Sequence, residues 1–124
     1  MNDYIKKAMR TNTESKDSIK KRLDSDDILD ILHGAMGLST EANEVLDNLK
    51  KTIYYGYDFD RDNLIEEMGD CMWYLALIAD TLGVNFKEIA DKNIAKLRTR
   101  YPRRFTKEDS LARDTNAERK VIEG

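Results

Sequence analysis

The chain has 124 residues, of which 36% are charged, and its formal net charge is −3. This length suits one domain with a real core, and the weak negative charge gives no electrostatic reason to expect a nucleic-acid polymer as partner. The single cysteine, Cys71, excludes an internal disulfide. No apolar run is long enough to span a bilayer, and the first residues lack the pattern of a signal peptide. We therefore expect a cytoplasmic protein with no membrane partner.

Three segments follow one another along the chain. Residues 1–24 are expected to hold a short amphipathic helix over residues 2–10 and then a polar connection. Residues 25–106 carry the long apolar periodicities and are expected to form the main helical domain. Residues 107–124 are highly charged with little apolar surface, which is typical of a charged helix or tail, and Thr106 can cap it.

The first long helix is predicted to begin at Ser25, a good N-cap residue, and to end at Gly56. Apolar residues recur at helical spacing between these two positions. Gly34 and Gly37 weaken the middle of this helix, which allows either a bend or a close contact with another helix.

The second long helix is predicted to begin after Asp60 and to end at Gly83. From Cys71 to Ala79 it carries no charged residue, so it is apolar on every side. A helix of this kind cannot lie on the surface of a small monomer, and we expect another subunit to cover its second side, with Trp73 at the interface.

A further helix is predicted from Asn85, which forms a capping-box-like start with Glu88, to about Arg100, before Pro102. The pattern as a whole predicts an all-α fold, a helical bundle with two long central helices that assembles as an oligomer.

Two pairs of acids stand three residues apart, Glu41 with Glu44 on the first long helix and Glu67 with Asp70 on the second. This spacing places both carboxylates of a pair on one side of the helix. If the helices pack antiparallel, four carboxylates converge and repel one another unless a cation lies between them. Mg²⁺ is the usual cation for oxygen ligands that also handle phosphates. Two solvated acidic faces are the alternative, although the apolar residues beside the acids favour a metal site.

Three stretches of the chain, residues 32–45, 66–76 and 93–102, resemble the MazG-like nucleoside triphosphate pyrophosphohydrolases. The signature of this family is two glutamates three apart, a spacer, and then a glutamate and an aspartate three apart. The resemblance implies an all-α Mg²⁺ enzyme, with Mn²⁺ as a substitute ion. Such an enzyme hydrolyses a nucleoside triphosphate, in particular a deoxynucleoside triphosphate, to the monophosphate and pyrophosphate. The resemblance also implies a homodimer or a dimer of dimers.

Carried over position by position, the resemblance places Glu41, Glu44, Glu67 and Asp70 around the metal. Attack at the α-phosphorus requires an in-line water, and a carboxylate of the cluster can accept its proton. Either Glu41 or Glu44 is the predicted catalytic base.

Donors for the substrate are predicted on the helix that follows. Asn93, Lys96 and Arg100 fall on one stripe that can present donors to phosphate or base. The resemblance favours Asn93 and Lys96, and a solvated basic face is the alternative for Arg100. His33, the only histidine, is a further candidate for nucleotide contact, although packing or capping is the favoured interpretation. Trp73 can stack a base, but subunit packing is favoured there.

Three other functions are compatible with parts of this pattern. A dUTPase-like member of the same all-α superfamily would share the metal cluster and differ in base recognition. A di-iron carboxylate bundle needs Glu-x-x-His on two helices, which a single histidine does not supply. A non-catalytic helical interaction protein would bind no Mg²⁺ and would not need the four carboxylates.

Overall fold

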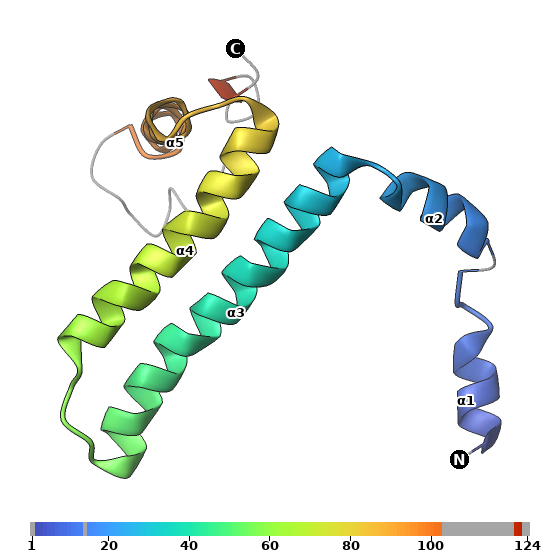
Figure 1. The fold of residues 1–124 in the computed structure, drawn as a ribbon, viewed down its shortest axis with the longest axis horizontal. Helices are drawn as coiled ribbons and strands as arrows, with labels where there is room; N and C mark the ends of the chain where they lie inside the picture. Colours follow the sequence, from blue (N-terminus) through green and yellow to red (C-terminus); the bar gives the residue numbers. More distant parts are fainter. Residues whose placement is uncertain (1, 14, 103–120, 123–124) are drawn as a thin grey trace. The chain divides into compact units, whose positions relative to one another are not determined.

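A computed structural model describes residues 2–13, 15–102 and 121–122 of the chain. These residues form five helices and no strand (Figure 1), so the predicted all-α class is confirmed. The helices are α1 Asn2–Met9, α2 Lys16–Leu23, α3 Asp26–Tyr55, α4 Arg61–Leu82 and α5 Phe86–Arg100. The helix predicted after Thr106 lies outside the described residues, and the division at residues 24 and 106 stays a prediction.

The chain divides into two compact units, Met1–Tyr74 and Leu75–Gly124, with the boundary inside the continuous helix α4. Within the part of the chain that the structure describes, no helix combines the length and the apolar character needed to cross a membrane.

Helix α2 corrects the prediction for the amino-terminal segment, because the polar connection after α1 is shorter than expected. The helix begins at Lys16, and the Oγ of Ser15 caps it by accepting the N–H of Ser18 at 3.4 Å. Asp17 in its first turn and basic residues in its last turn complement the helix dipole. None of its residues is buried. Its sequence accordingly lacks the apolar periodicity that would have predicted a helix.

The predicted ends of α3 are confirmed. The Oγ of Ser25 accepts the N–H of Ile28 at 3.4 Å, which satisfies one of the free donors of the first turn. Gly56 ends the helix with a φ of 70°, a left-handed conformation that favours glycine. The next residue, Tyr57, donates its N–H back to the carbonyl of Lys51 at 3.2 Å.

The predicted boundaries of α4 and α5 are also confirmed. The carboxylate of Asp60 accepts the N–H of Asn63 at 3.0 Å and so caps α4. Gly83, with a φ of 69°, follows the last residue of α4. Asn85 caps α5, because its Oδ1 accepts the N–H of Glu88 at 2.9 Å.

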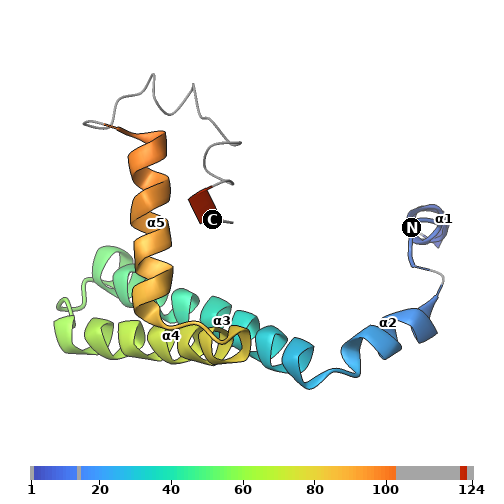
Figure 2. The same ribbon diagram turned by 90° about the horizontal axis from the view of Figure 1, so that it is seen from above.

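Within the first unit, α3 and the part of α4 up to Tyr74 run antiparallel and side by side, as Figures 1 and 2 both show. Gly37 is buried against the ring of Tyr74, and a Cβ at this position would overlap that ring. Of the two interpretations of the mid-helix glycines, the structure therefore shows a close helix contact at Gly37.

Apolar burial within a single chain is small. Among the described residues, Ala79 is the only buried hydrophobic side chain, while many large apolar side chains are exposed. On the first unit's part of α4, Ile65, Met68 and Met72 are 49%, 58% and 55% exposed. These three residues lie at helical spacing on one stripe, so the helix presents a continuous apolar face to solvent.

Candidate metal centre

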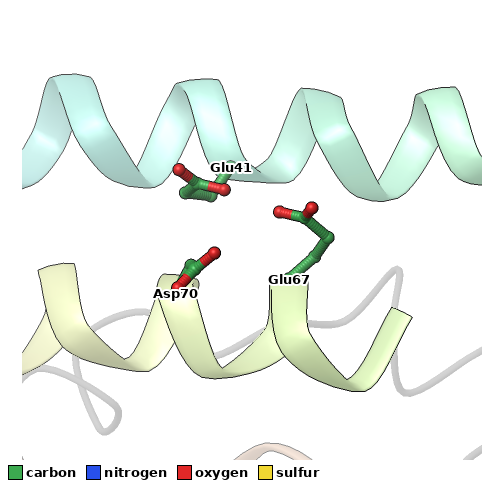
Figure 3. A group of neighbouring side chains, drawn as sticks. All are labelled: Glu41, Glu67 and Asp70. Carbon is green, nitrogen blue, oxygen red and sulfur yellow. The ribbon is translucent and has the colours of Figure 1, made fainter. Parts of the chain in front are cut away.

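Three carboxylates converge between α3 and α4. Glu41 comes from α3, and Glu67 and Asp70 come from α4, with their carboxylates directed toward one another (Figure 3). One oxygen of each lies within 4.8 Å of the others. Three of the four predicted acids thus lie together between the two helices.

The register between the two helices explains this convergence. Along α3, steps of four, three and four residues lead from Gly37 through positions 41 and 44 to Asn48. Along α4, which runs in the opposite direction, the same steps lead backwards from Tyr74 through positions 70 and 67 to Asn63. Steps of three and four keep all these positions on the facing sides of the helices. The facing positions form four layers. The two middle layers consist of acids, and they lie between the contact of Gly37 with Tyr74 on one side and the amides of Asn48 and Asn63 on the other.

The acid cluster changes the proton affinity of one of its members. A hydrogen bond with Glu67 raises the pKa of Glu41 above its ordinary value. Desolvation and the negative charges of Asp70, Glu67 and Glu44 raise it further. The cluster therefore favours positive charge at its centre.

Glu44 stands apart from the group of three. With Glu67 it lines a hollow of about 360 Å³ that extends toward the α3–α4 loop and includes Lys51, Asp58 and Asp60 in its wall. The predicted fourth metal residue is thus adjacent to the cluster through Glu67, but its carboxylate does not belong to the tight set.

Lys51 is a cation in a hollow whose other charged residues are acidic. Its Nζ lies 3.0 Å from the carboxylate of Asp47, one turn earlier on α3. The hydrogen bond with Asp47 and the charge of that carboxylate raise the pKa of Lys51, so the lysine stays charged.

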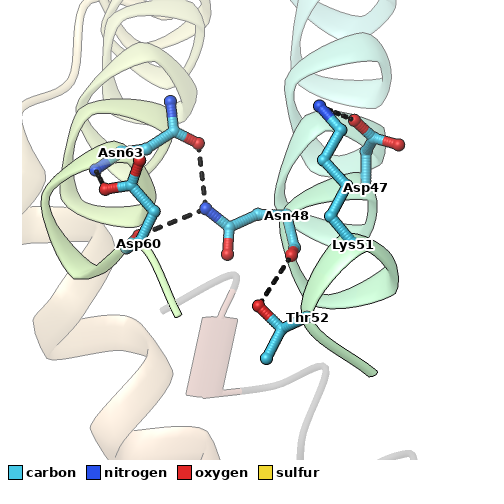
Figure 4. Close-up of polar contacts among 6 residues, drawn as sticks. All are labelled: Asp47, Asn48, Lys51, Thr52, Asp60 and Asn63. Atoms are coloured by element: carbon cyan, nitrogen blue, oxygen red, sulfur yellow. Dashed lines mark hydrogen bonds and ion pairs between the residues drawn. The ribbon is translucent and has the colours of Figure 1, made fainter. Parts of the chain in front are cut away.

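A buried amide, which was not predicted from the sequence, links the two helices on one side of the acids. Asn48 is 8% exposed, and its Nδ2 donates to Asn63 Oδ1 at 2.9 Å and to the carbonyl of Asp60 at 3.2 Å (Figure 4). The residue spacing contains the signal for this pair. Once Glu41 is set opposite Asp70, equal steps along the antiparallel helices bring Asn48 opposite Asn63.

Aromatic rings lie at the other end of the cluster. The rings of Trp73 and Tyr74 pack edge to face with centroids 5.1 Å apart, and His33 packs edge to face on Tyr74 at 5.8 Å. Trp73 and Tyr74 also line a smaller hollow of about 190 Å³ together with Glu41 and Asp70. His33 thus lies in an aromatic cluster beside the acids.

The remaining predicted substrate residues lie in the second unit. Asn93 and Lys96 line a hollow of about 290 Å³ along α5, together with Ile89, Lys92 and Ile122. Lys92 donates to the backbone carbonyl of Ile122 at 2.7 Å.

Arg100, the third predicted donor, does not line this hollow; its guanidinium lies 5.2 Å from the ring centroid of Tyr101. The structure therefore brings together two of the three donors predicted on α5.

The donor set at the centre fits a hard divalent cation. All three groups are carboxylates, which Mg²⁺ prefers, and two ligands on opposite sides of Mg²⁺ lie about 4 Å apart. The observed spread of no more than 4.8 Å is therefore close to that of a coordinated set, and small side-chain rotations would complete it.

Comparison with known proteins agrees with a helical domain that carries this acidic centre. Residues 33–105 match the MazG nucleotide pyrophosphohydrolase domain. The chain is also similar to the Gene 37 protein of Mycobacterium phage L5, with 36% identity over 87 residues that cover 64% of this chain and 74% of that protein. No solved structure matches. The chain belongs to the family of MazG nucleotide pyrophosphohydrolase domains, and all three clustered acids lie within the matched residues.

Proposed function

We propose that this protein hydrolyses nucleoside triphosphates, in particular deoxynucleoside triphosphates, to the monophosphate and pyrophosphate, with Mg²⁺ as the cofactor and Mn²⁺ as a substitute. The observation that carries the proposal is the convergence of Glu41, Glu67 and Asp70 from two helices, with oxygens no more than 4.8 Å apart. Family membership supplies the class of reaction. Bound Mg²⁺ would neutralise phosphate charge and lower the pKa of a coordinated water.

The carboxylates have separate roles in this proposal. Glu41, Glu67 and Asp70 would hold the cation, which would compete with protons for the cluster because the pKa of Glu41 is raised. Glu44 is exposed and lies outside the tight set, one helical turn beyond Glu41. Its carboxylate remains available to accept the proton of the attacking water, so we assign it the role of catalytic base.

Four further residues are proposed as substrate contacts, each described within its own unit. Asn93 and Lys96 line one hollow and present an amide and a cation, which suit phosphate oxygens or a base edge. Arg100 is kept as a third donor of the same helix. His33 packs with the aromatic side chains next to the cluster, where a nucleotide base can also stack.

A single copy of the chain leaves its apolar surface in water, which supports a homodimer or a dimer of dimers. The stripe of Ile65, Met68 and Met72 is about half exposed on α4, while Glu67 and Asp70 of the same helix turn toward α3. Burying one such side chain contributes roughly 1.5–3 kcal/mol. A second copy that covers this stripe would supply the core that the described residues lack. We place the assembly in the cytoplasm.

The products test the reaction. In ¹⁸O-labelled water, attack on the α-phosphorus places the label in the monophosphate and releases unlabelled pyrophosphate. Release of diphosphate and orthophosphate would contradict the proposal. A panel of ribo- and deoxyribonucleoside triphosphates, dUTP included, identifies the preferred substrate and separates a dUTPase from a broader hydrolase.

Neighbouring glutamates offer a matched pair of variants for the metal site. Glu67→Gln removes a carboxylate of the cluster and should abolish Mg²⁺-dependent hydrolysis without loss of helical content. Glu66→Gln makes the same change at an exposed residue outside the cluster and should keep wild-type turnover within about twofold, since surface changes have small effects. Equal activity of the two variants would remove Glu67 from the site.

A further inference from the structure

We propose that Asn48 is a positioning residue for the metal centre. Its amide fixes the register between α3 and α4 at which Glu41, Glu67 and Asp70 meet. The inference rests on the proposed cation site and adds to it a residue that would not touch the cation.

The amide of Asn48 is held in one orientation. Its two Nδ2 hydrogens are both used, one by Asn63 Oδ1 at 2.9 Å and one by the backbone carbonyl of Asp60 at 3.2 Å. The side chain is 8% exposed, and its Oδ1 is buried without a hydrogen-bond partner. A rotated amide would place its oxygen against two acceptors, so the observed orientation is the one that satisfies the bonds between the helices.

The acid layers cannot hold this register by themselves. Glu41 lies close to Glu67 and Asp70 across the two helices, and these carboxylates repel one another in their charged forms. The register therefore depends on contacts in the flanking layers. On one side the contact of Gly37 with the ring of Tyr74 is a steric contact without a directional bond. On the other side the bonds of Asn48 are directional, which makes them sensitive to register.

Asn48 is placed where it can act on both acid layers. It lies one helical turn beyond Glu44 on α3, and its partner Asn63 lies one turn before Glu67 on α4. A slip of one residue along either helix turns each side chain by about 100°. Such a slip would rotate one or more carboxylates out of the cluster, so the amide bonds select the register that a cation can use.

Two isosteric variants separate positioning from charge. Asn48→Asp replaces the donor by a carboxylate that faces Asn63 Oδ1 and the Asp60 carbonyl. The Asn63 amide can rotate to donate, but the backbone carbonyl of Asp60 cannot, so at least one bond becomes a repulsion. Asn63→Asp keeps an acceptor opposite the Asn48 donor and preserves both bonds. Each variant adds one negative charge, and that charge alone would strengthen cation binding in both.

The measurement is calorimetric titration of the purified full chain with Mn²⁺ without nucleotide, accompanied by circular dichroism and thermal unfolding. We expect Asn48→Asp to bind Mn²⁺ about tenfold more weakly than wild type. This is the size of effect that follows when residues that orient metal ligands are changed. Asn63→Asp should bind at least as tightly as wild type. The opposite signs would exclude charge as the cause.

Other outcomes are equally decisive. If Asn48→Asp binds Mn²⁺ as tightly as Asn63→Asp, Asn48 has no positioning role. If wild type binds no Mn²⁺, the proposed metal site fails instead. If Asn48→Asp is not helical at the assay temperature, Asn63→Ala replaces it, since this variant removes one acceptor and keeps the bond to Asp60. It should bind Mn²⁺ more weakly than wild type, and unchanged binding would overturn the inference.

Discussion

Replacing Gly37 with alanine inserts one methyl group between α3 and α4, a single turn away from Glu41. The methyl would overlap the ring of Tyr74, which lies one turn from Asp70. To restore ordinary carbon–carbon contact of about 3.5–4.0 Å, the ring would have to move by roughly 1.5 Å. Such a shift would change the separation of α3 and α4 beside Glu41 and Asp70, so we expect Gly37→Ala to lower Mn²⁺ affinity by about tenfold.

The expected stability change combines two terms. Alanine in a helix interior is favoured over glycine by about 1 kcal/mol, whereas overpacking costs about 1–3 kcal/mol. Gly37→Ala should therefore change the free energy of unfolding by between zero and about −2 kcal/mol. Gly69→Ala is the matched control, since Gly69 is also helical but a Cβ there meets nothing within 4 Å. It should gain up to about 1 kcal/mol and keep wild-type metal affinity.

Calorimetric Mn²⁺ titration, thermal unfolding and light scattering of the variants give the comparison. Tyr74→Ala in the background of Gly37→Ala removes the obstructing ring and should recover part of the lost affinity. The close-contact reasoning would be refuted if Gly37→Ala and Gly69→Ala bound Mn²⁺ equally and unfolded at the same temperature.

Two further predictions concern protons and assembly. Because the pKa of Glu41 is raised, the metal-free folded protein holds more protons than the unfolded chain between the ordinary carboxyl pKa and the raised value. Its stability should therefore fall as pH rises through this window, and Glu41→Gln should flatten that slope in thermal unfolding measured with a chelator present. Trp73→Glu should weaken assembly and activity together, because Trp73 is 58% exposed beside the apolar face of α4. Light scattering that finds monomeric wild type at micromolar concentration would contradict the predicted oligomer.

Local signals in the sequence predicted the helix ends well. Ser25, Asp60 and Asn85 act through hydrogen bonds to residues three positions away, and Gly56 acts through its own backbone angle. Each of these helix ends depends on a few neighbouring residues, so a short stretch of sequence is enough to predict it. Helix α2 was missed because its charged sequence lacks the apolar periodicity on which the prediction depended.

The acidic cluster required information that no single helix contains. The spacing of Glu41 and Glu44 places them on one side of α3, but it does not determine which of them meets the acids of α4. The register decides this point, and it places Glu41 in the tight group while Glu44 faces the neighbouring hollow. Asn48 was missed for the same reason, since an asparagine in a helix has no evident role until its partner on the other helix is known.

The position of Trp73 gives the protein an intrinsic optical signal. It is the only tryptophan of the chain, and its indole borders the small hollow that Glu41 and Asp70 also line. A change of charge at these carboxylates alters the electric field on the indole, to which the wavelength of tryptophan emission responds. Each copy of the chain thus carries one natural fluorophore beside its acidic centre, so occupancy of that centre can be followed in unlabelled protein, in real time and before any bond is broken.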